Sequence, residues 1–169
     1  MKNIVLIGMP GSGKTTIGKS LAAKLGRTFC DADYLLEEWE GKTIKDLFAV
    51  SEEKFRESET RTIKRLADTE DMIIATGGGV VKKPENMELL KINGIIIFID
   101  RSPELICADV DVASRPLLAA GRQRIFELYK ERFGLYQKYK DFVVVNKGEP
   151  ETVANEIINI LKKVERRKF

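Results

Sequence analysis

The chain has 169 residues, of which 43% are hydrophobic and 33% are charged, and its formal net charge is +3. This length and balance favour a single globular domain over residues 1–169, and the small net charge gives no reason to expect binding to nucleic acid. Because the chain contains no histidine, histidine bases and histidine metal sites are excluded, and any general base must be an aspartate, a glutamate, a lysine, a tyrosine or water.

Short apolar runs alternate with amphipathic segments along the chain. The runs are continuous and mostly rich in β-branched residues, as is typical of strands buried on both faces, and they cover 3–7, 28–30, 72–75, 95–99 and 142–145. Helical patterns cover 14–25, 52–67, 84–91, 123–139 and 151–164. This alternation predicts an α/β fold with a five-stranded parallel sheet and helices on both faces. Ligands of such sheets bind at the carboxyl ends of the strands.

A phosphate-binding loop follows the first strand. Residues 8–15, GMPGSGKT, fit the pattern G-x-x-x-x-G-K-[ST] between a strand and a helix. Loop N–H groups surround phosphate oxygens, Lys14 reaches the terminal phosphates, and the Thr15 hydroxyl can ligate Mg²⁺. The expected ATP-binding residues here are Gly11, Ser12, Gly13, Lys14, Thr15 and Thr16. GTPases, motor ATPases and small-molecule kinases share this loop, so the other strand ends must discriminate among them.

Two aspartates follow the second strand in "CDADYLLEE". Asp31 and Asp33 would share a side of an extended chain. Near Mg·ATP, one carboxylate can support the metal through water while the other accepts a hydrogen bond or a proton from a hydroxyl group. The alternative for Asp33 is the N-cap of the helix that begins at "YLLEEW".

Three glycines, Gly77, Gly78 and Gly79, follow the third strand in "IIATGGGVV". Consecutive glycines are costly in conformational entropy, so they indicate either close approach of the backbone to a ligand or a tight turn. Thr76 stands where phosphate-loop proteins commonly place an aspartate. Asp100, at the end of the fourth strand, is the alternative candidate for the aspartate that supports magnesium in such proteins.

Three arginines are candidates for binding anions. Arg56 has Glu59 three residues later as a helical partner, and Arg132 lies in "LYKERFGLYQKY". Either could equally be an ordinary surface charge. Arg115 begins "RPLL" after the polar stretch "ADVDVAS", and this segment has the character of a mobile cover rather than of core.

Six motifs, in this order and at this spacing, resemble the shikimate kinase family over nearly the whole chain: GMPGSGKTT, DAD, FRESE, TGGG, SRPLL and RFGLY. The resemblance implies a three-layer phosphate-loop fold like that of nucleoside-monophosphate kinases, with five parallel strands. It also implies a mobile lid over residues 106–121 and a shikimate-binding segment over residues 31–60. The implied reaction transfers the γ-phosphoryl group of ATP to the 3-hydroxyl of shikimate, in the route to chorismate and aromatic amino acids.

The resemblance also implies roles at the acceptor site. Asp33 would hold the shikimate hydroxyls and act as the base, and Arg56 and Arg132 would clamp the carboxylate, with Glu59 orienting Arg56. The backbone of residues 77–79 would contact the ring. A guanidinium group matches a carboxylate in a bidentate way, which agrees with this assignment.

At the donor site, the resemblance makes Lys14 and Arg115 catalytic together with Asp33, and Arg115 would reach the phosphates with the lid. Thr15 would ligate Mg²⁺, with Asp31 near it through water. One departure falls here, because "CADVDVAS" carries Asp109 and Asp111 and no arginine, whereas the family usually has more basic residues ahead of "RPLL".

Two other functions stay open from the sequence. One is a kinase of another small hydroxy acid, such as gluconate, and the other is a phosphate-loop protein that binds nucleotide without transferring a phosphoryl group. No apolar run reaches the length of a membrane span, and the opening residues do not resemble a signal peptide. We therefore expect a cytoplasmic monomer that acts on ATP and a small acceptor, with no membrane or nucleic-acid partner.

Overall fold

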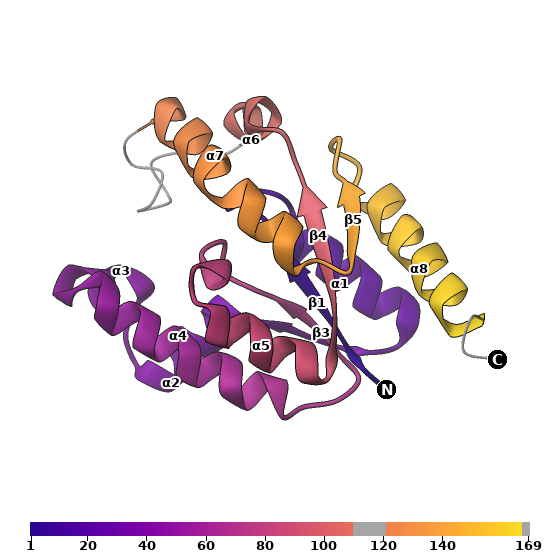
Figure 1. The fold of residues 1–169 in the computed structure, drawn as a ribbon, viewed down its shortest axis with the longest axis horizontal. Coiled ribbons are helices and arrows are strands. Elements are labelled where there is room, and N and C mark those ends of the chain that lie inside the picture. The colour runs from indigo at the N-terminus through magenta and orange to yellow at the C-terminus, as the bar shows by residue number, and fades with distance from the viewer. Residues whose placement is uncertain (110–120, 167–169) are drawn as a thin grey trace.

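A five-stranded parallel sheet forms the centre of the protein (Figure 1). The computed structural model describes residues 1–109 and 121–166. The strands lie in the order β2-β3-β1-β4-β5, and their bounds are Asn3–Ile7 (β1), Thr28–Asp31 (β2), Met72–Ala75 (β3), Gly94–Asp100 (β4) and Phe142–Val145 (β5). The predicted α/β class, the strand number and the parallel pairing are confirmed.

Helices cover both faces of this sheet (Figure 1). Their bounds are Lys14–Leu25 (α1), Ala32–Glu40 (α2), Ile44–Val50 (α3), Glu52–Ala67 (α4), Pro84–Ile92 (α5), Pro103–Asp109 (α6), Arg122–Tyr139 (α7) and Pro150–Arg166 (α8), with a short 3₁₀ helix η1 at Val80–Lys82. The five helical patterns expected from the sequence correspond to α1, α4, α5, α7 and α8.

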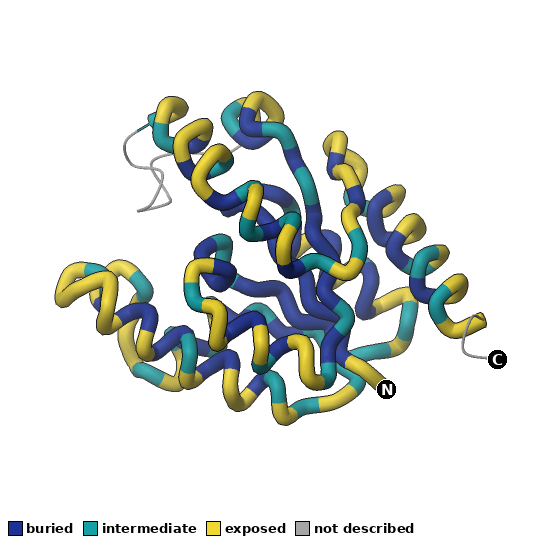
Figure 2. Tube along the Cα trace, in the orientation of Figure 1, coloured by how far each residue is buried: buried dark blue, intermediate teal, exposed yellow. Residues whose placement is uncertain are grey.

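Alternate residues of the central strand β1 enter two separate hydrophobic cores. Ile4 and Leu6 pack with α1 and α8, whereas Val5 and Ile7 pack with α4, α5 and α7. Because side chains alternate across a strand, a strand between two helical layers must be apolar at every position. Figure 2 shows the result as continuous burial along the central strands, with alternating burial along the helices.

A small helical layer beside β2 is built from α2, α3 and α4. Leu36, Leu47 and Phe55, one from each helix, share a hydrophobic cluster of their own. The sequence reading did not include α3, although Thr43 and Asp46 form a capping box at its start. The pattern T-x-x-D is the local signal that could have revealed this helix.

The carboxyl ends of β1, β2, β3 and β4 meet at one edge of the sheet, because the strands are parallel and adjacent. The phosphate loop follows β1, Asp31 ends β2, Thr76 and the three glycines follow β3, and Arg101 follows β4. Within the described residues, no helix is both long and apolar enough to cross a membrane.

Candidate functional site

A cavity of about 710 Å³ lies at this edge of the sheet. It is bordered on one side by α3, through Ile44 and Phe48. Glu37 of α2, Thr43 and Lys45 line it as well. The segments at the strand ends supply the other lining residues, which are Pro10, Gly11, Gly13, Lys14, Thr15 and Thr16 after β1, Asp31 and Asp33 at β2, Thr76, Gly77 and Gly78 after β3, and Arg101 and Asp109 after β4. Of the predicted donor-side residues, Gly11, Gly13, Lys14, Thr15, Thr16 and Asp31 border one space, which Asp33 also lines. Ser12 is not part of the lining, and Arg115 lies outside the described residues.

The phosphate loop is held in shape by its own lysine. The Nζ atom of Lys14, on the first residue of α1, donates hydrogen bonds of 2.8 Å to the carbonyl oxygens of Gly8 and Met9. From the far side of the loop, Nδ2 of Asn146 donates to the carbonyl oxygen of Ser12 at 2.8 Å. These bonds satisfy three carbonyl groups of the loop, and the N–H groups of such a loop are the donors for phosphate oxygens.

Asp31, rather than Asp33, caps helix α2. Oδ1 of Asp31 accepts hydrogen bonds from the backbone N–H groups of Asp33 and Tyr34, at 3.1 and 3.3 Å. The alternative that Asp33 serves as the N-cap is therefore wrong, because the helix begins at Ala32. Capping by Asp31 leaves the Asp33 carboxylate available to the cavity.

The Asp33 carboxylate lies against the glycine segment. A Cβ atom at Gly77 would come within 2.7 Å of Oδ1 of Asp33, so only glycine fits there without displacing the carboxylate. Burial, reinforced by the negative charges of Glu59 and Asp31, raises the pKa of Asp33 to about 6, and the Lys14 ammonium offsets part of this shift. A carboxylate with a raised pKa is well matched to accept a proton near neutral pH.

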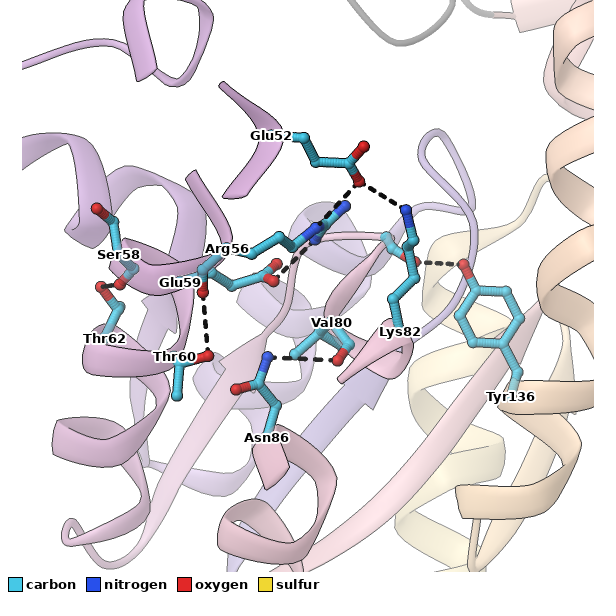
Figure 3. A network of polar contacts seen from close by, with 11 residues as sticks. Glu52, Arg56, Ser58, Glu59, Thr60, Thr62, Val80, Lys82, Asn86 and Tyr136 are labelled. Carbon is cyan, nitrogen blue, oxygen red and sulfur yellow. Dashed lines mark hydrogen bonds and ion pairs between the residues drawn. The ribbon is translucent and has the colours of Figure 1, made fainter. Parts of the chain in front are cut away.

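A buried ion pair, shown in Figure 3, lies next to Gly79. Nη1 of Arg56 donates to Oε2 of Glu59 at 2.8 Å, and both side chains are almost fully buried. Glu52 approaches Nε of Arg56 at 3.5 Å and also accepts a hydrogen bond of 2.6 Å from Lys82. The helical pair of Arg56 and Glu59 expected from the sequence is present, and Arg56 is not an ordinary surface charge.

Gly79 allows the Arg56 guanidinium to approach the backbone. A Cβ atom at Gly79 would lie 2.6 Å from Nη1 and 2.8 Å from Cζ of Arg56. The backbone of Gly79 has a negative φ of −96°, so it is close approach and not backbone strain that requires glycine here. The segment does turn, because the N–H of Val80 donates to the carbonyl oxygen of Gly77 at 3.2 Å. Since neither Gly77 nor Gly79 has a positive φ, the close contacts and not the turn require glycine at these two positions.

Arg132 is buried with part of its guanidinium unpartnered. It comes from α7, is only 3% exposed, and its Nε and Nη1 atoms have no hydrogen-bond partner among the described residues. Its positive charge acts on Glu59, which also faces Arg56, so the two arginines share one buried carboxylate. Burying an unpaired guanidinium is costly, which points to an anion that completes this site.

Tyr136, one turn after Arg132, ties α7 to the glycine segment. Its hydroxyl donates a 2.6 Å hydrogen bond to the carbonyl oxygen of Gly78 (Figure 3). Burial raises the pKa of Tyr136 to about 12, while the nearby Arg132 acts in the opposite direction, so the hydroxyl stays a donor. Tyr136 lies within the RFGLY motif, but no role was predicted for it.

Oxygen atoms suited to Mg²⁺ meet at the opening of the phosphate loop. Oγ1 of Thr15 donates to Oδ2 of Asp31 at 2.7 Å, so the predicted pair of hydroxyl and carboxylate is in contact. Hard cations such as Mg²⁺ take oxygen ligands of this kind. Within the part of the chain that the structure describes, no cluster of three histidine, cysteine or acidic side chains could hold a metal ion. The donor set therefore fits an ion that enters with phosphate oxygens and water rather than a closed protein site.

Thr76 and Asp100 stand at the two strand ends where a magnesium-supporting aspartate was considered, and both make other hydrogen bonds. Thr76 donates from Oγ1 to the carbonyl oxygen of Leu6 at 2.9 Å, which links β3 to β1. Asp100 accepts a hydrogen bond of 3.0 Å from the Tyr129 hydroxyl. The acidic group next to the phosphate loop comes instead from Asp31 on β2.

Two further residues that the sequence reading left without a role contact the phosphate loop. Asn146 directly follows β5, and Arg101 directly follows β4. Position after a buried parallel strand was the available signal for both. Arg115, and residues 110–120 of the expected lid, lie outside the described residues, so their predicted roles stay predictions.

A family model and curated relatives both match this chain, and they indicate the same family. A family model described as shikimate kinase matches residues 10–162. A protein named shikimate kinase from Clostridium botulinum (strain Eklund 17B / Type B) is 49% identical over 162 residues, covering 95% of this chain and 98% of that protein.

Solved structures of shikimate kinases share the fold of this chain. The structure of shikimate kinase from Acinetobacter baumannii in complex with shikimate has a TM-score of 0.91 at 33% identity, covering 96% of this chain and 94% of that one. Shikimate kinase from Aquifex aeolicus has a TM-score of 0.83 at 34% identity, with 95% and 96% coverage.

Substitution of Gly79 by alanine tests the close approach to Arg56. We expect Gly79→Ala to lower the free energy of unfolding by about 1–3 kcal/mol, because the new methyl group collides with a buried guanidinium. In an Arg56→Ala background the same change should cost much less, and chemical denaturation measures both. Gly134→Ala, in open space on α7, is the matched control and should be neutral or stabilising. Equal costs of Gly79→Ala in both backgrounds would contradict this contact.

The raised pKa of Asp33 predicts a specific pH dependence of stability. The folded state binds this proton more tightly than the unfolded state, so Asp33 lowers stability as pH rises from about 4 to about 6. Asp33→Asn should therefore be more stable than the wild type at pH 7, by an amount of order 1 kcal/mol, and the difference should vanish near pH 4. Thermal unfolding of both proteins at several pH values measures it. A variant that is less stable at pH 7 would mean that the ionised carboxylate supports the fold.

Proposed function

The chain belongs to the shikimate kinase family, and from this premise we propose that it transfers the γ-phosphoryl group of ATP to the 3-hydroxyl of shikimate. The products are ADP and shikimate 3-phosphate. The proposal combines a donor site at the phosphate loop with an acceptor site at the glycine segment. The two sites meet at Asp33 and Gly78, which both line the cavity.

The observation that carries the choice of acceptor is the buried guanidinium of Arg132 with two unpartnered nitrogen atoms. Together with Arg56 it places two positive charges near the buried carboxylate of Glu59, while the second acidic partner of Arg56, Glu52, is half-exposed and also binds Lys82. A small acceptor with one carboxylate supplies the missing negative charge, and its planar group matches a guanidinium fork. Glu59 keeps the Arg56 fork in place as a positioning residue.

Asp33 is the residue that we assign to the acceptor hydroxyls. Its pKa of about 6 leaves it largely ionised at neutral pH, as a base must be before the reaction. In the transfer step the acceptor oxygen forms a bond to the γ-phosphorus, and the bond from that phosphorus to the bridging oxygen of ADP breaks. The proton of the acceptor hydroxyl passes to Asp33.

Lys14 is assigned to the terminal phosphates of ATP. Its ammonium group now donates to the Gly8 and Met9 carbonyls, and its long side chain can redirect donors to phosphate oxygens without a change in the backbone. Residues 11–16 would supply backbone N–H groups and the positive end of α1. Phosphoryl transfer depends mainly on such positioning and charge stabilisation. Arg115 remains the proposed third catalytic group on the donor side.

Mg²⁺ is the proposed metal of the donor site. Thr15 would hold it directly and Asp31 through water, in keeping with their contact at 2.7 Å. Bound there, the ion would offset the negative charge that gathers on the β- and γ-phosphate oxygens. Every group named for the reaction lies on one chain, so we expect a cytoplasmic monomer that uses only small-molecule substrates.

A coupled assay of ADP release tests the proposed function. With Mg·ATP present, we expect turnover with shikimate and little or none with gluconate or without an acceptor. Asp33→Ala should reduce shikimate turnover by at least about a thousandfold while nucleotide affinity stays near the wild-type value, because the base acts on the acceptor and not on ATP.

Three results would contradict this function or one of its parts. Turnover of gluconate in place of shikimate would indicate another hydroxy-acid kinase. Nucleotide binding without any acceptor-dependent turnover would indicate a binding protein. A loss of ADP binding in Asp33→Ala as large as the loss of turnover would make Asp33 a structural or metal-supporting residue.

A further inference from the structure

Arg101 places a second cationic group against the phosphate loop. It directly follows β4, lines the cavity and is only 8% exposed. Its Nη1 atom donates to the carbonyl oxygen of Gly11 at 3.2 Å, and its Nη2 atom forms an ion pair with Asp109 at the end of α6. None of the roles assigned so far uses this residue.

The guanidinium of Arg101 is not fully satisfied in this arrangement. Its buried Nε atom has no hydrogen-bond partner among the described residues. The pair is uneven, because the Asp109 side chain is 59% exposed and can return to water, whereas the Arg101 side chain is 9% exposed and needs an anion beside it. An anion in the cavity can therefore replace Asp109 at little cost while Gly11 keeps the arginine in place.

The charge balance of the donor site also leaves room for another cation. ATP carries about four negative charges, and Lys14 is the basic side chain that the phosphate loop itself provides. Between Arg101 and Arg115 the sequence contains no lysine or arginine, but it contains Asp109 and Asp111. Beside Lys14, Mg²⁺ and Arg115, a further cation on this side of the nucleotide has to come from another part of the fold, and Arg101 is in contact with the loop already.

We propose that Arg101 binds the phosphate groups of the nucleoside di- or triphosphate, and that Asp109 occupies its guanidinium when no nucleotide is bound. The proposal rests on the proposed use of ATP as donor. Nη1 keeps its bond to Gly11, while Nε and Nη2 turn toward phosphate oxygens and Asp109 is released to solvent. A planar group with five donors can hold a loop carbonyl and an anion at the same time.

The opposing explanation is a purely structural tie, in which Arg101 fastens α6 to the phosphate loop. The two explanations differ in what Asp109 does. A structural tie needs both partners, so loss of either would disturb the loop in the same way. A phosphate-binding arginine needs only Arg101, because Asp109 competes with the ligand.

Equilibrium binding of Mg·ADP, measured without any acceptor, separates these explanations. We expect Arg101→Met to weaken Mg·ADP binding by at least about tenfold, as is typical for loss of a charge-assisted contact. Asp109→Asn should bind Mg·ADP as tightly as the wild type or more tightly. In the Arg101→Met background, Asp109→Asn should have no further effect.

Arg27→Met is the matched control. Arg27 is another nearly buried arginine paired with a half-exposed aspartate, Asp71, but it lies at the amino ends of the strands, away from the cavity, where its guanidinium donates to the carbonyl oxygen of Lys2. We expect it to leave Mg·ADP binding unchanged. Arg101→Lys keeps the charge without the fork, and should bind with intermediate affinity even if the methionine variant folds poorly.

Two outcomes would overturn the proposal. One is wild-type affinity for Mg·ADP in Arg101→Met. The other is an equal loss of affinity in Arg101→Met and Asp109→Asn, with an equal fall in melting temperature, which is the signature of a structural tie. Because no acceptor is present in these measurements, a failure of shikimate turnover would leave this result intact, and the two proposals fail separately.

Discussion

The burial of two arginines with a single buried glutamate is the constraint on which the acceptor side of this protein depends, since the other acidic partner of Arg56, Glu52, is half-exposed. Arg56 and Arg132 come from helices on different parts of the chain, yet both face Glu59. A charge imbalance of this kind inside a protein is costly unless an anion completes it. The surrounding fold holds the imbalance in place: Gly79 admits the Arg56 guanidinium, and Tyr136 ties α7, which carries Arg132, to the Gly78 carbonyl. The glycine segment therefore connects the parts of the acceptor site, because it contacts Arg56 of α4, Tyr136 of α7 and the Asp33 carboxylate.

The donor side is built by a different means, from strand ends and loop carbonyls. Parallel pairing brings the ends of β2, β1 and β4 to one edge, and each contributes one contact to the phosphate loop region: Asp31 to Thr15, Lys14 to Gly8, and Arg101 to Gly11. The two aspartates of "DAD" have separate tasks because Asp31 caps α2 and meets Thr15, which leaves Asp33 to the acceptor. One short motif thus joins the metal-binding side to the hydroxyl-binding side.

Much of this arrangement follows from local sequence, and some of it does not. The strands and the long helices were predictable because a parallel sheet between two helical layers requires continuous apolar runs, as in β1. Asp33 was predictable as a site residue. The sequence could not show that Asp31 caps the helix in its place, because either aspartate of "DAD" could serve as the N-cap. The choice between a surface charge and a buried clamp for Arg132 depends on which turn of α7 faces the sheet, and that is decided by tertiary packing. Arg101 escaped notice because no motif marks it: its role depends on the adjacency of β4 to the phosphate loop.

The most direct test of the buried charge imbalance is a comparison of shikimate with its uncharged methyl ester as ligands, by isothermal titration calorimetry without nucleotide. If Arg132 and Arg56 bind the carboxylate of the acceptor, shikimate should bind the wild type at least about tenfold more tightly than the ester. In Arg132→Met that preference should shrink, with most of the loss in shikimate affinity and little in ester affinity. Equal affinities of the wild type for shikimate and its ester would contradict the claim that these arginines select the acceptor by its negative charge.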